Sequence, residues 1–160
     1  MEKIYLLLGS NIGDRAKHLE EGRKMIEKQI GKITGASHLY ETAPWGFKDQ
    51  DDFYNQAVEV ETNKSPKEVL TISKEIEKEV GRLSNEKWHP RILDIDILLF
   101  GKKVLEEESL QIPHKSMHER NFALIPLMEL VPELIHPKLD LTIEELFWNC
   151  EDDLDVIRLD

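Results

Sequence analysis

The stretch from Lys87 to Phe100 constrains the fold of this chain more than any other. It reads KWHPRILDIDILLF, a cationic and aromatic loop that runs into an apolar strand carrying Asp94 and Asp96. Because side chains alternate between the two faces of a strand, Asp94 and Asp96 share one face. The same alternation is expected to direct the apolar neighbours into a core, namely Leu93, Ile95, Ile97 and Leu99. The fold must therefore bury one face of this strand and satisfy two carboxylates on the other.

Two carboxylates on one strand face are typical of a divalent-metal site. Mg²⁺ binds one or two carboxylates, keeps several waters and completes its coordination with substrate phosphates. The alternative interpretation is an ordinary solvent-facing strand, on which a D-x-D pair is common. Cationic and aromatic residues close upstream favour the metal site, namely Arg82, Lys87, Trp88 and Arg91.

The length and charge of the chain limit its organisation and its partners. At 160 residues we expect one compact domain covering residues 1–160. The net charge of −11 argues against nucleic acid as a partner, so an anionic substrate needs a local group of cations. No apolar run reaches membrane length and the chain opens directly into a strand, so we expect neither a transmembrane helix nor a signal peptide. Cys150 is the single cysteine, which fits a cytoplasmic location.

The order of strand and helix patterns predicts the fold class. Strands are expected over residues 3–8, 32–40, 53–62 and around Asp94, and helices over residues 15–30 and 65–81. This βαββαβ order predicts an α+β protein with a ferredoxin-like sandwich, an antiparallel sheet with helices packed on it. We expect a C-terminal hairpin within residues 104–112, and short helices over residues 122–130 and 142–148 on the outside of the sheet.

Short motifs recur in one order along nearly the whole chain. They are LGSNxGD at 8–14, ETxPxG at 41–46, FYN at 53–55, GR at 81–82, WxPRxxDxD at 88–96, and PH followed by RxF between 113 and 122. Each motif alone is weak, but together they resemble one family, the hydroxymethyl-dihydropterin pyrophosphokinases. The ferredoxin-like fold of that family agrees with the order of elements.

The resemblance implies an enzyme, a 2-amino-4-hydroxy-6-hydroxymethyldihydropteridine diphosphokinase of folate biosynthesis. It would transfer pyrophosphate from MgATP to the hydroxymethyl group of 6-hydroxymethyl-7,8-dihydropterin, giving the pterin diphosphate and AMP. Its partners would be small molecules, with ATP as co-substrate and two Mg²⁺ ions as cofactors. The pterin oxygen would attack the β-phosphorus in line, so positioning and charge neutralisation would carry the reaction.

The resemblance also implies roles for individual residues. Asp94 and Asp96 would bind the metal ions and, with Arg82 and Arg91, would form the catalytic group. Contacts to ATP would come from Glu77, Arg82, Trp88, Arg91, Ile97, His114 and Arg120, with adenine near Ile97 and residues 110–112 and with Glu77 in a supporting role. Contacts to the pterin would come from Thr42, Ala43, Trp45, Phe53, Asn55, Trp88, Asp94 and Phe122. The pterin ring would stack on Phe53 and Phe122, and Arg82 and Trp88 would lie on a loop that closes over the substrates.

The chain departs from the family pattern in and after this loop. His89 stands where the family often has glycine, and Ser84 stands where the loop usually carries a further arginine. Lys115 follows His114 where relatives also show an aromatic residue, and we expect Lys115 to supply a replacement phosphate contact.

We expect no covalent nucleophile in this chain. Ser10 has no evident base partner and Cys150 has no nearby motif. Four histidines are expected to be surface or packing residues, namely His18, His38, His89 and His136.

Two other functions fit parts of the sequence. A two-metal nucleotidyltransferase or phosphodiesterase could use Asp94 and Asp96, and AMP release that depends on the pterin would separate it from the pyrophosphokinase. A non-catalytic ferredoxin-like module that senses nucleotide would bind without turnover, and the D-x-D pair with Arg82 and Arg91 argues against it. No heptad repeat or long exposed apolar edge indicates an obligate dimer, so we expect a monomer.

Overall fold

A computed structural model gives the structure of the chain and describes residues 1–43, 52–83 and 92–159. Over these residues the main sheet contains six strands, namely β1 (Glu2–Ser10), β2 (Lys32–Ala36), β3 (Leu39–Thr42), β4 (Phe53–Thr62), β5 (Asp94–Phe100) and β8 (Val156–Leu159). The helices are α1 (Arg15–Gln29), α2 (Pro66–Leu83), α3 (Asn121–Leu130) and α4 (Ile143–Asn149). A separate hairpin joins β6 (Leu105–Glu107) to β7 (Leu110–Ile112), and a short 3₁₀ helix spans Met117–Glu119.

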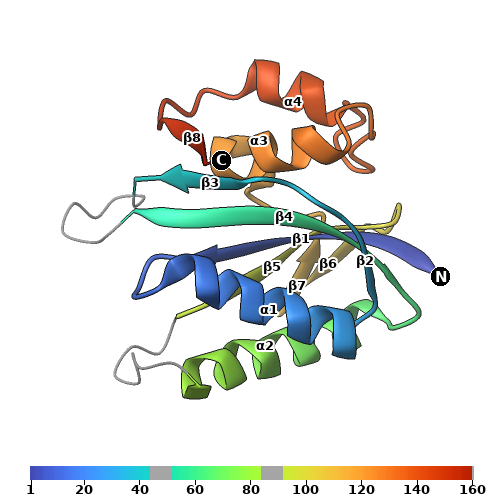
Figure 1. Ribbon diagram of the computed structural model, residues 1–160. Coiled ribbons are helices and arrows are strands. Elements are labelled where there is room, and N and C mark those ends of the chain that lie inside the picture. The colour runs from blue at the N-terminus through green and yellow to red at the C-terminus, as the bar shows by residue number, and fades with distance from the viewer. Residues whose placement is uncertain (44–51, 84–91, 160) are drawn as a thin grey trace.

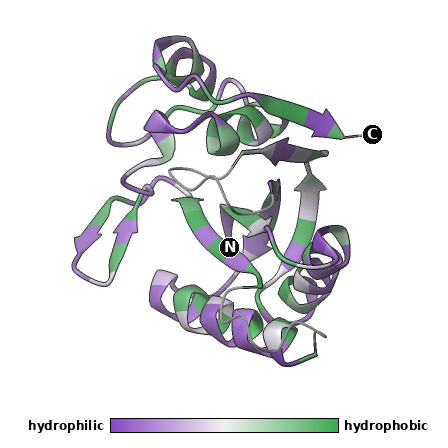
Figure 2. Cartoon of the chain, turned by 90° about the vertical axis from the view of Figure 1, so that its left-hand side faces the viewer, coloured by the Kyte–Doolittle hydropathy of each residue, from purple (hydrophilic) through white to green (hydrophobic). Residues whose placement is uncertain are grey.

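The sheet lies between two layers of helices (Figure 1). Its strand order is β5-β1-β4-β3-β8, β2 also pairs with β4, and all of these pairings are antiparallel. Helices α1 and α2 cover one face and α3 and α4 cover the other, while the β6–β7 hairpin projects to the side (Figure 2). The protein is therefore of mixed α+β class, with an antiparallel sheet and packed helices. In the part of the chain that the structure describes, no helix is both long and apolar enough to cross a membrane.

Two apolar clusters hold these layers together. Leu6 and Leu8 of β1 belong to the cluster under α1 and α2, whereas Tyr5 and Leu7 belong to the cluster under α3 and α4. Strand β1 lies inside the sheet, so the alternation of its side chains feeds both clusters. The two helical layers consequently depend on the same central strands.

Strand β5 departs from the predicted alternation near its C-terminal end. The pairing with β1 shifts between Ile97 and Leu99, so Leu98 forms a bulge. Leu99 therefore joins the cluster under α3, whereas Ile95 and Ile97 join the cluster under α2. The prediction that all three share a face is wrong for Leu99, because the bulge reverses the alternation within a uniformly apolar run.

Other element boundaries differ from the sequence pattern for local reasons. The predicted strand over residues 32–40 is two strands, since Ser37 interrupts it: its N–H donates to the Ala57 carbonyl over 2.9 Å and its Oγ accepts the Ala57 N–H over 3.0 Å. Helix α2 continues past Gly81 to Leu83, because Gly81 leaves the backbone helical without a left-handed turn. The pattern did not predict β8, a four-residue strand.

Candidate active site

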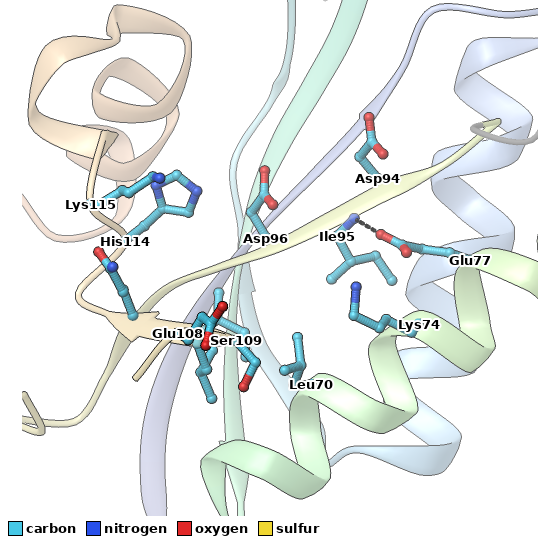
Figure 3. A pocket seen from close by; sticks show the side chains of 13 residues that line it. Leu70, Lys74, Glu77, Asp94, Ile95, Asp96, Glu108, Ser109, His114 and Lys115 are labelled. Atoms are coloured by element: carbon cyan, nitrogen blue, oxygen red, sulfur yellow. Dashed lines mark hydrogen bonds between the residues drawn. The ribbon is translucent and has the colours of Figure 1, made fainter. Parts of the chain in front are cut away.

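A cleft of about 270 Å³ opens along the outer edge of β5, and we call it the β5 cleft (Figure 3). Its walls are one face of α2, the β6–β7 hairpin and the segment that follows β7. The lining residues are Leu70, Lys74, Glu77, Asp94, Ile95, Asp96, Ile97, Glu108, Ser109, Leu110, Gln111, His114 and Lys115.

Two hydrogen bonds fasten the cleft walls to the free edge of β5. The Ile95 N–H donates to Glu77 Oε2 of α2 over 2.7 Å, and the His114 N–H donates to the Leu98 carbonyl over 2.9 Å. Strand β5 is last in the sheet order, so these edge groups need partners from outside the sheet. Asp96 lies between the two attachment points, where both walls meet the strand.

Asp94 and Asp96 project from the same side of β5, as the alternation predicts (Figure 3). Asp96 is exposed and pairs in register with Leu7 of β1, whereas Asp94 is half-buried and pairs with Gly9. Leu7 belongs to the cluster under α3, so the two carboxylates stand on the α3 side of the sheet. They therefore lie both in the β5 cleft and at the end of the sheet face that α3 covers.

Glu77 brings a third carboxylate to the β5 cleft. Burial raises its pKa above the ordinary value, and the Asp94 and Asp96 carboxylates raise it further, although the Ile95 hydrogen bond and Lys74 oppose the shift. The upward shift shows that this end of the cleft disfavours further negative charge. A cation held by Asp94 and Asp96 would relieve that repulsion.

His114 faces the cleft as a neutral hydrogen-bond donor. Burial lowers the pKa of its imidazole, and the nearby Arg120 and Lys115 lower it too, against the opposing effect of Asp96. Its Nδ1 accepts the Ser116 N–H over 3.1 Å. A neutral ring that accepts at Nδ1 carries its hydrogen on Nε2. His114 can therefore donate one hydrogen bond to an anionic oxygen.

A second group of side chains continues along the same sheet face, and we call Thr42, Phe53 and Asn55 the sheet-face group. In the pairings, Asn55 lies opposite Gly9 and Thr42 lies opposite Phe53. Asn55 Nδ2 donates to Thr42 Oγ1 over 3.3 Å. A Cβ on Gly9 would lie 2.7 Å from Asn55 Oδ1, so the glycine makes room for the amide. The local sequence thus fixes a hydrogen-bonded amide and hydroxyl beside an aromatic ring.

Arg120 and Phe122 reach this region from the start of α3. The Arg120 guanidinium carbon lies 5.6 Å from the Phe122 ring centroid, and both side chains are half-buried. Arg120 also lies close enough to His114 to lower its pKa. One end of α3 therefore brings a cation and an aromatic ring near the cleft.

The structure brings together some of the predicted site residues and not others. Those lining the β5 cleft are Glu77, Asp94, Asp96, Ile97 and His114. Arg82 is not a lining residue here, because its exposed guanidinium pairs with Glu79 on the preceding turn of α2. Ala43 is exposed after the end of β3. Trp45, Trp88 and Arg91 lie outside the described residues, as do the departures at Ser84 and His89.

Several lining residues were not predicted. Leu70 and Lys74 precede Glu77 by seven and three positions on α2, so they share its helical face. Helical spacing from Glu77 could have found both residues. The hairpin side chains of Glu108 and Ser109 carry no such signal, because their place depends on how the hairpin docks beside β5, whereas Leu110 and Gln111 lie in the segment expected near adenine.

The expectation that Ser10 lacks a base partner is wrong. Ser10 Oγ lies 3.4 Å from His18 Nδ1, an arrangement that the eight-residue separation in sequence did not reveal. Both residues are buried, with 1% and 6% of their surface exposed. His18 is a packing residue, as predicted, and so is the buried His136.

Comparison with known proteins decides the family. The model of the 7,8-dihydro-6-hydroxymethylpterin-pyrophosphokinase (HPPK) family matches residues 5–132. The chain belongs to this family. The family resemblance that the short motifs carry is thus confirmed. Relatives of about the same length as this chain bear the same family name.

Two such relatives are bacterial enzymes. The 2-amino-4-hydroxy-6-hydroxymethyldihydropteridine pyrophosphokinase of Aquifex aeolicus is 40% identical over 86% of this chain and 85% of its own. The protein of the same name from Bacillus subtilis is 42% identical over 81% of this chain and 78% of its own. Other relatives are much longer: the chain spans 22% of the folic acid synthesis protein FOL1 of Dictyostelium discoideum, at 38% identity.

Solved structures agree on the fold. The crystal structure of wild-type Plasmodium falciparum HPPK-DHPS aligns with a TM-score of 0.74 at 23% identity. The alignment covers 93% of this chain and 43% of that one. At this identity the likeness supports the shared arrangement of sheet and helices alone.

Proposed function

We propose that this HPPK-family chain transfers pyrophosphate from MgATP to the hydroxymethyl group of 6-hydroxymethyl-7,8-dihydropterin in folate biosynthesis. The products are the pterin diphosphate and AMP. One observation carries the proposal: Asp94 and Asp96 stand where the β5 cleft meets the sheet face that bears Thr42, Phe53 and Asn55. A nucleotide in the cleft and a flat ring on the sheet face would meet at the two carboxylates.

The β5 cleft suits ATP. Leu70, Ile97 and Leu110 offer apolar surface for adenine at the end between α2 and the hairpin. His114 and Lys115 line the other end, where the phosphates would lie, and Arg120 is near His114. Cations and a neutral imidazole donor are the groups that phosphate oxygens require.

The sheet-face group suits the pterin. Thr42 and Asn55 present a hydroxyl and an amide to the polar edge of the ring, and Ala43 offers backbone groups beside them. Phe53 on β4 and Phe122 on α3 would stack on the ring. We also propose that Trp45 and Trp88 contribute to this pocket.

Asp94 and Asp96 fit two Mg²⁺ ions. The described residues contain no group of three or more His, Cys, Asp or Glu side chains placed to hold a metal. Two carboxylates on one strand face suit a hard cation whose other ligands are waters and phosphate oxygens. When bound, Mg²⁺ would neutralise the phosphate charge and orient the reacting oxygens.

The chain's own residues would position the reaction. The sheet-face group would hold the pterin so that its hydroxymethyl oxygen attacks the β-phosphorus of ATP. The bond between the β-phosphorus and the α,β-bridging oxygen breaks, and AMP leaves with that oxygen on its α-phosphorus. The His114 Nε2–H and the Arg120 guanidinium would donate to phosphate oxygens. We propose that Arg82 and Arg91 complete this set of donors, with Arg82 leaving Glu79 to do so.

We also propose that the molecule is a ferredoxin-like sandwich. The order β5-β1-β4 followed by β2 and β3, with α1 and α2 on one face, supports a ferredoxin-like sandwich. We propose that residues 1–160 form one domain and act as a monomer. A cytoplasmic location stays a prediction from the single Cys150.

The direct test is AMP formation from ATP and Mg²⁺, with and without the pterin. Wild type should form AMP only with the pterin, and Asp96→Ala should lose at least about 100-fold in kcat because the phosphate charge is no longer neutralised. Glu75→Ala, which removes an exposed acid of α2, serves as the control and should match wild type. Pterin-independent AMP, or an unaffected Asp96→Ala, would contradict the proposal.

A further inference from the structure

The C-terminal residues 152–159, which we call the C-terminal strap, contact two walls of the proposed pterin site. They lie beyond residues 5–132, the part that the HPPK family model matches. The strap begins with Asp152 at the start of α3 and ends with β8 at the edge of the sheet. It therefore links the helix that carries Phe122 to the strand that carries Thr42 (Figure 1).

Asp152 caps α3 from a distance of 31 residues in sequence. Its Oδ2 accepts the Asn121 N–H over 2.9 Å, and its backbone carbonyl accepts Asn121 Nδ2 over 3.0 Å. Its Oδ1 accepts the Leu154 N–H over 3.1 Å, which fixes the carboxylate itself. Arg120, the local N-cap residue, makes no side-chain cap hydrogen bond. A carboxylate at a helix N-terminus satisfies an otherwise unpaired N–H and matches the helix dipole.

Asn121 is the residue through which this cap acts on the site. It lies between Arg120 and Phe122, which come together at the start of α3. Its Oδ1 is buried and has no hydrogen-bond partner among the described residues. Its amide is therefore anchored, within that part of the chain, through Nδ2 to Asp152.

Strand β8 supports the opposite wall. It pairs antiparallel with β3, placing Val156 opposite Thr42 and Ile157 opposite Glu41. Strand β3 has four residues and pairs with β4 on its other side. The strap thus holds Thr42 from the outer edge while Asp152 holds Asn121 and its neighbours.

We propose that Asp152 is a positioning residue for the pterin, setting the Phe122 wall against the wall formed by Thr42 and Asn55. This inference rests on the proposed function. The residues that line the β5 cleft come from α2, β5, the hairpin and the segment that follows it, and none of them hydrogen-bonds to Asp152 within the described residues. Arg120, one proposed phosphate contact, adjoins Asn121, but the other described ATP contacts lie in the β5 cleft, so loss of the cap should weaken pterin binding more than ATP binding.

The test is a graded series of variants in full-length protein. Asp152→Ala should raise the KM for the pterin about tenfold, and Asp152→Asn, which keeps one carbonyl acceptor, should raise it less. The KM for ATP should change less than about twofold in both. Asp153→Ala removes the neighbouring exposed carboxylate and should match wild type. Titration with the pterin, in the presence of an ATP analogue with a methylene bridge between the α- and β-phosphorus, should show the same graded loss of binding.

These outcomes distinguish a positioning role of Asp152 from a role in protein stability alone. A lower melting temperature with an unchanged pterin KM in Asp152→Ala would overturn the inference and leave a structural cap only. Equal rises in both KM values would overturn it as well. If wild type makes no pterin-dependent AMP, the proposed function fails first; if wild type turns over and the series is flat, the inference alone fails.

Discussion

At the scale of single residues, the β5 cleft has an unfavourable charge for a nucleotide until cations enter it. Its lining includes four carboxylates, from Glu77, Asp94, Asp96 and Glu108, against two lysines, Lys74 and Lys115. Burial raises the pKa of Glu77, and the neighbouring Asp94 and Asp96 carboxylates raise it further. A triphosphate can therefore bind well only with metal ions on Asp94 and Asp96. The two lysines would add to the positive charge that the phosphates meet in the cleft.

Lys115 provides a prediction at this scale. Lys115→Ala should raise the KM for ATP about fivefold, because an exposed lysine that meets a phosphate contributes about 1 kcal/mol. The KM for the pterin should stay unchanged. Steady-state kinetics with each substrate varied in turn would show this, with the exposed Lys102→Ala as the control. An unchanged KM for ATP would remove Lys115 from the phosphate site.

Residue patterns predicted the acid pair because strand alternation is local. Asp94 and Asp96 needed only their spacing and their apolar neighbours to be placed on one face. Asp152 could not be found in this way, because its partner Asn121 is 31 residues away and the strap forms only in the folded chain. The contact of Ser10 with His18 spans only eight residues, but it was missed because it depends on how α1 packs beside the end of β1.

At the scale of elements, α3 is held at both ends by carboxylates, Asp152 at its start and Glu129 in its last turn. Glu129 accepts the His38 N–H over 3.0 Å and the Tyr40 hydroxyl over 2.6 Å, and it lies 2.8 Å from His38 Nδ1. Burial alone would raise the pKa of Glu129, but the hydrogen bonds from Tyr40 and His38 hold it below its ordinary value of 4.5.

Glu129 should therefore make stability depend on acid pH. A carboxyl whose folded pKa is lowered stabilises fully above its unfolded pKa, and this stability is lost as pH falls through the folded pKa. Glu129→Gln should be less stable than wild type at neutral pH by about 1–2 kcal/mol. As the pH falls below the ordinary carboxyl pKa of 4.5, it should lose less free energy of unfolding than wild type does. Urea unfolding across this range measures both. Equal acid slopes in wild type, Glu129→Gln and the exposed control Glu133→Gln would contradict the assignment.

Two glycines, Gly31 between α1 and β2 and Gly81 within α2, should respond in opposite ways to substitution by alanine. A Cβ on Gly31 would lie 2.0 Å from the Glu61 carbonyl oxygen, where α1 passes into β2, whereas a Cβ on Gly81 in α2 would meet nothing within 4 Å. Gly31→Ala should thus destabilise by about 2 kcal/mol or more, because backbone must move. Gly81→Ala should stabilise by about 0.5–1 kcal/mol through helix propensity. Thermal melts that reverse this order would contradict the packing at Gly31.

The sequence predicted elements that have a long hydrophobic period. It did not predict features that depend on which strands pair and in which register. The pattern from Ser65 onward predicted α2, because Ser65 and Glu68 form a capping box and an apolar stripe follows at helical spacing, namely Val69, Ile72, Ile76 and Val80. Strand β8 has four residues, too few for a period, and forms because β3 offers an open edge. The Leu98 bulge depends on the register with β1, which an apolar run does not encode.

At the scale of the whole molecule, the sheet joins two apolar clusters through shared strands. Strand β1 contributes to both clusters, and β4 does too through Val58 and Ala57. If one helical layer separated from the sheet, it would expose apolar side chains of the strands that also support the other layer. This arrangement favours a single cooperative unit.

Unfolding should therefore be one transition. Far-UV circular dichroism and tryptophan fluorescence should give the same urea midpoint, with a free energy of unfolding of about 5–15 kcal/mol. MgATP at about 100 times its dissociation constant should add about 2.7 kcal/mol. Two separate midpoints would indicate that the α3 and α4 layer unfolds by itself.

Transfer of pyrophosphate at the junction of the β5 cleft and the sheet-face group can be followed atom by atom. The most direct measurement follows a radiolabel from ATP into products in the presence of the pterin and Mg²⁺. Label on the γ-phosphorus should appear in the pterin product, and label on the α-phosphorus should remain in AMP. Label from the α-phosphorus on the pterin, or γ-label released as free phosphate, would contradict pyrophosphate transfer.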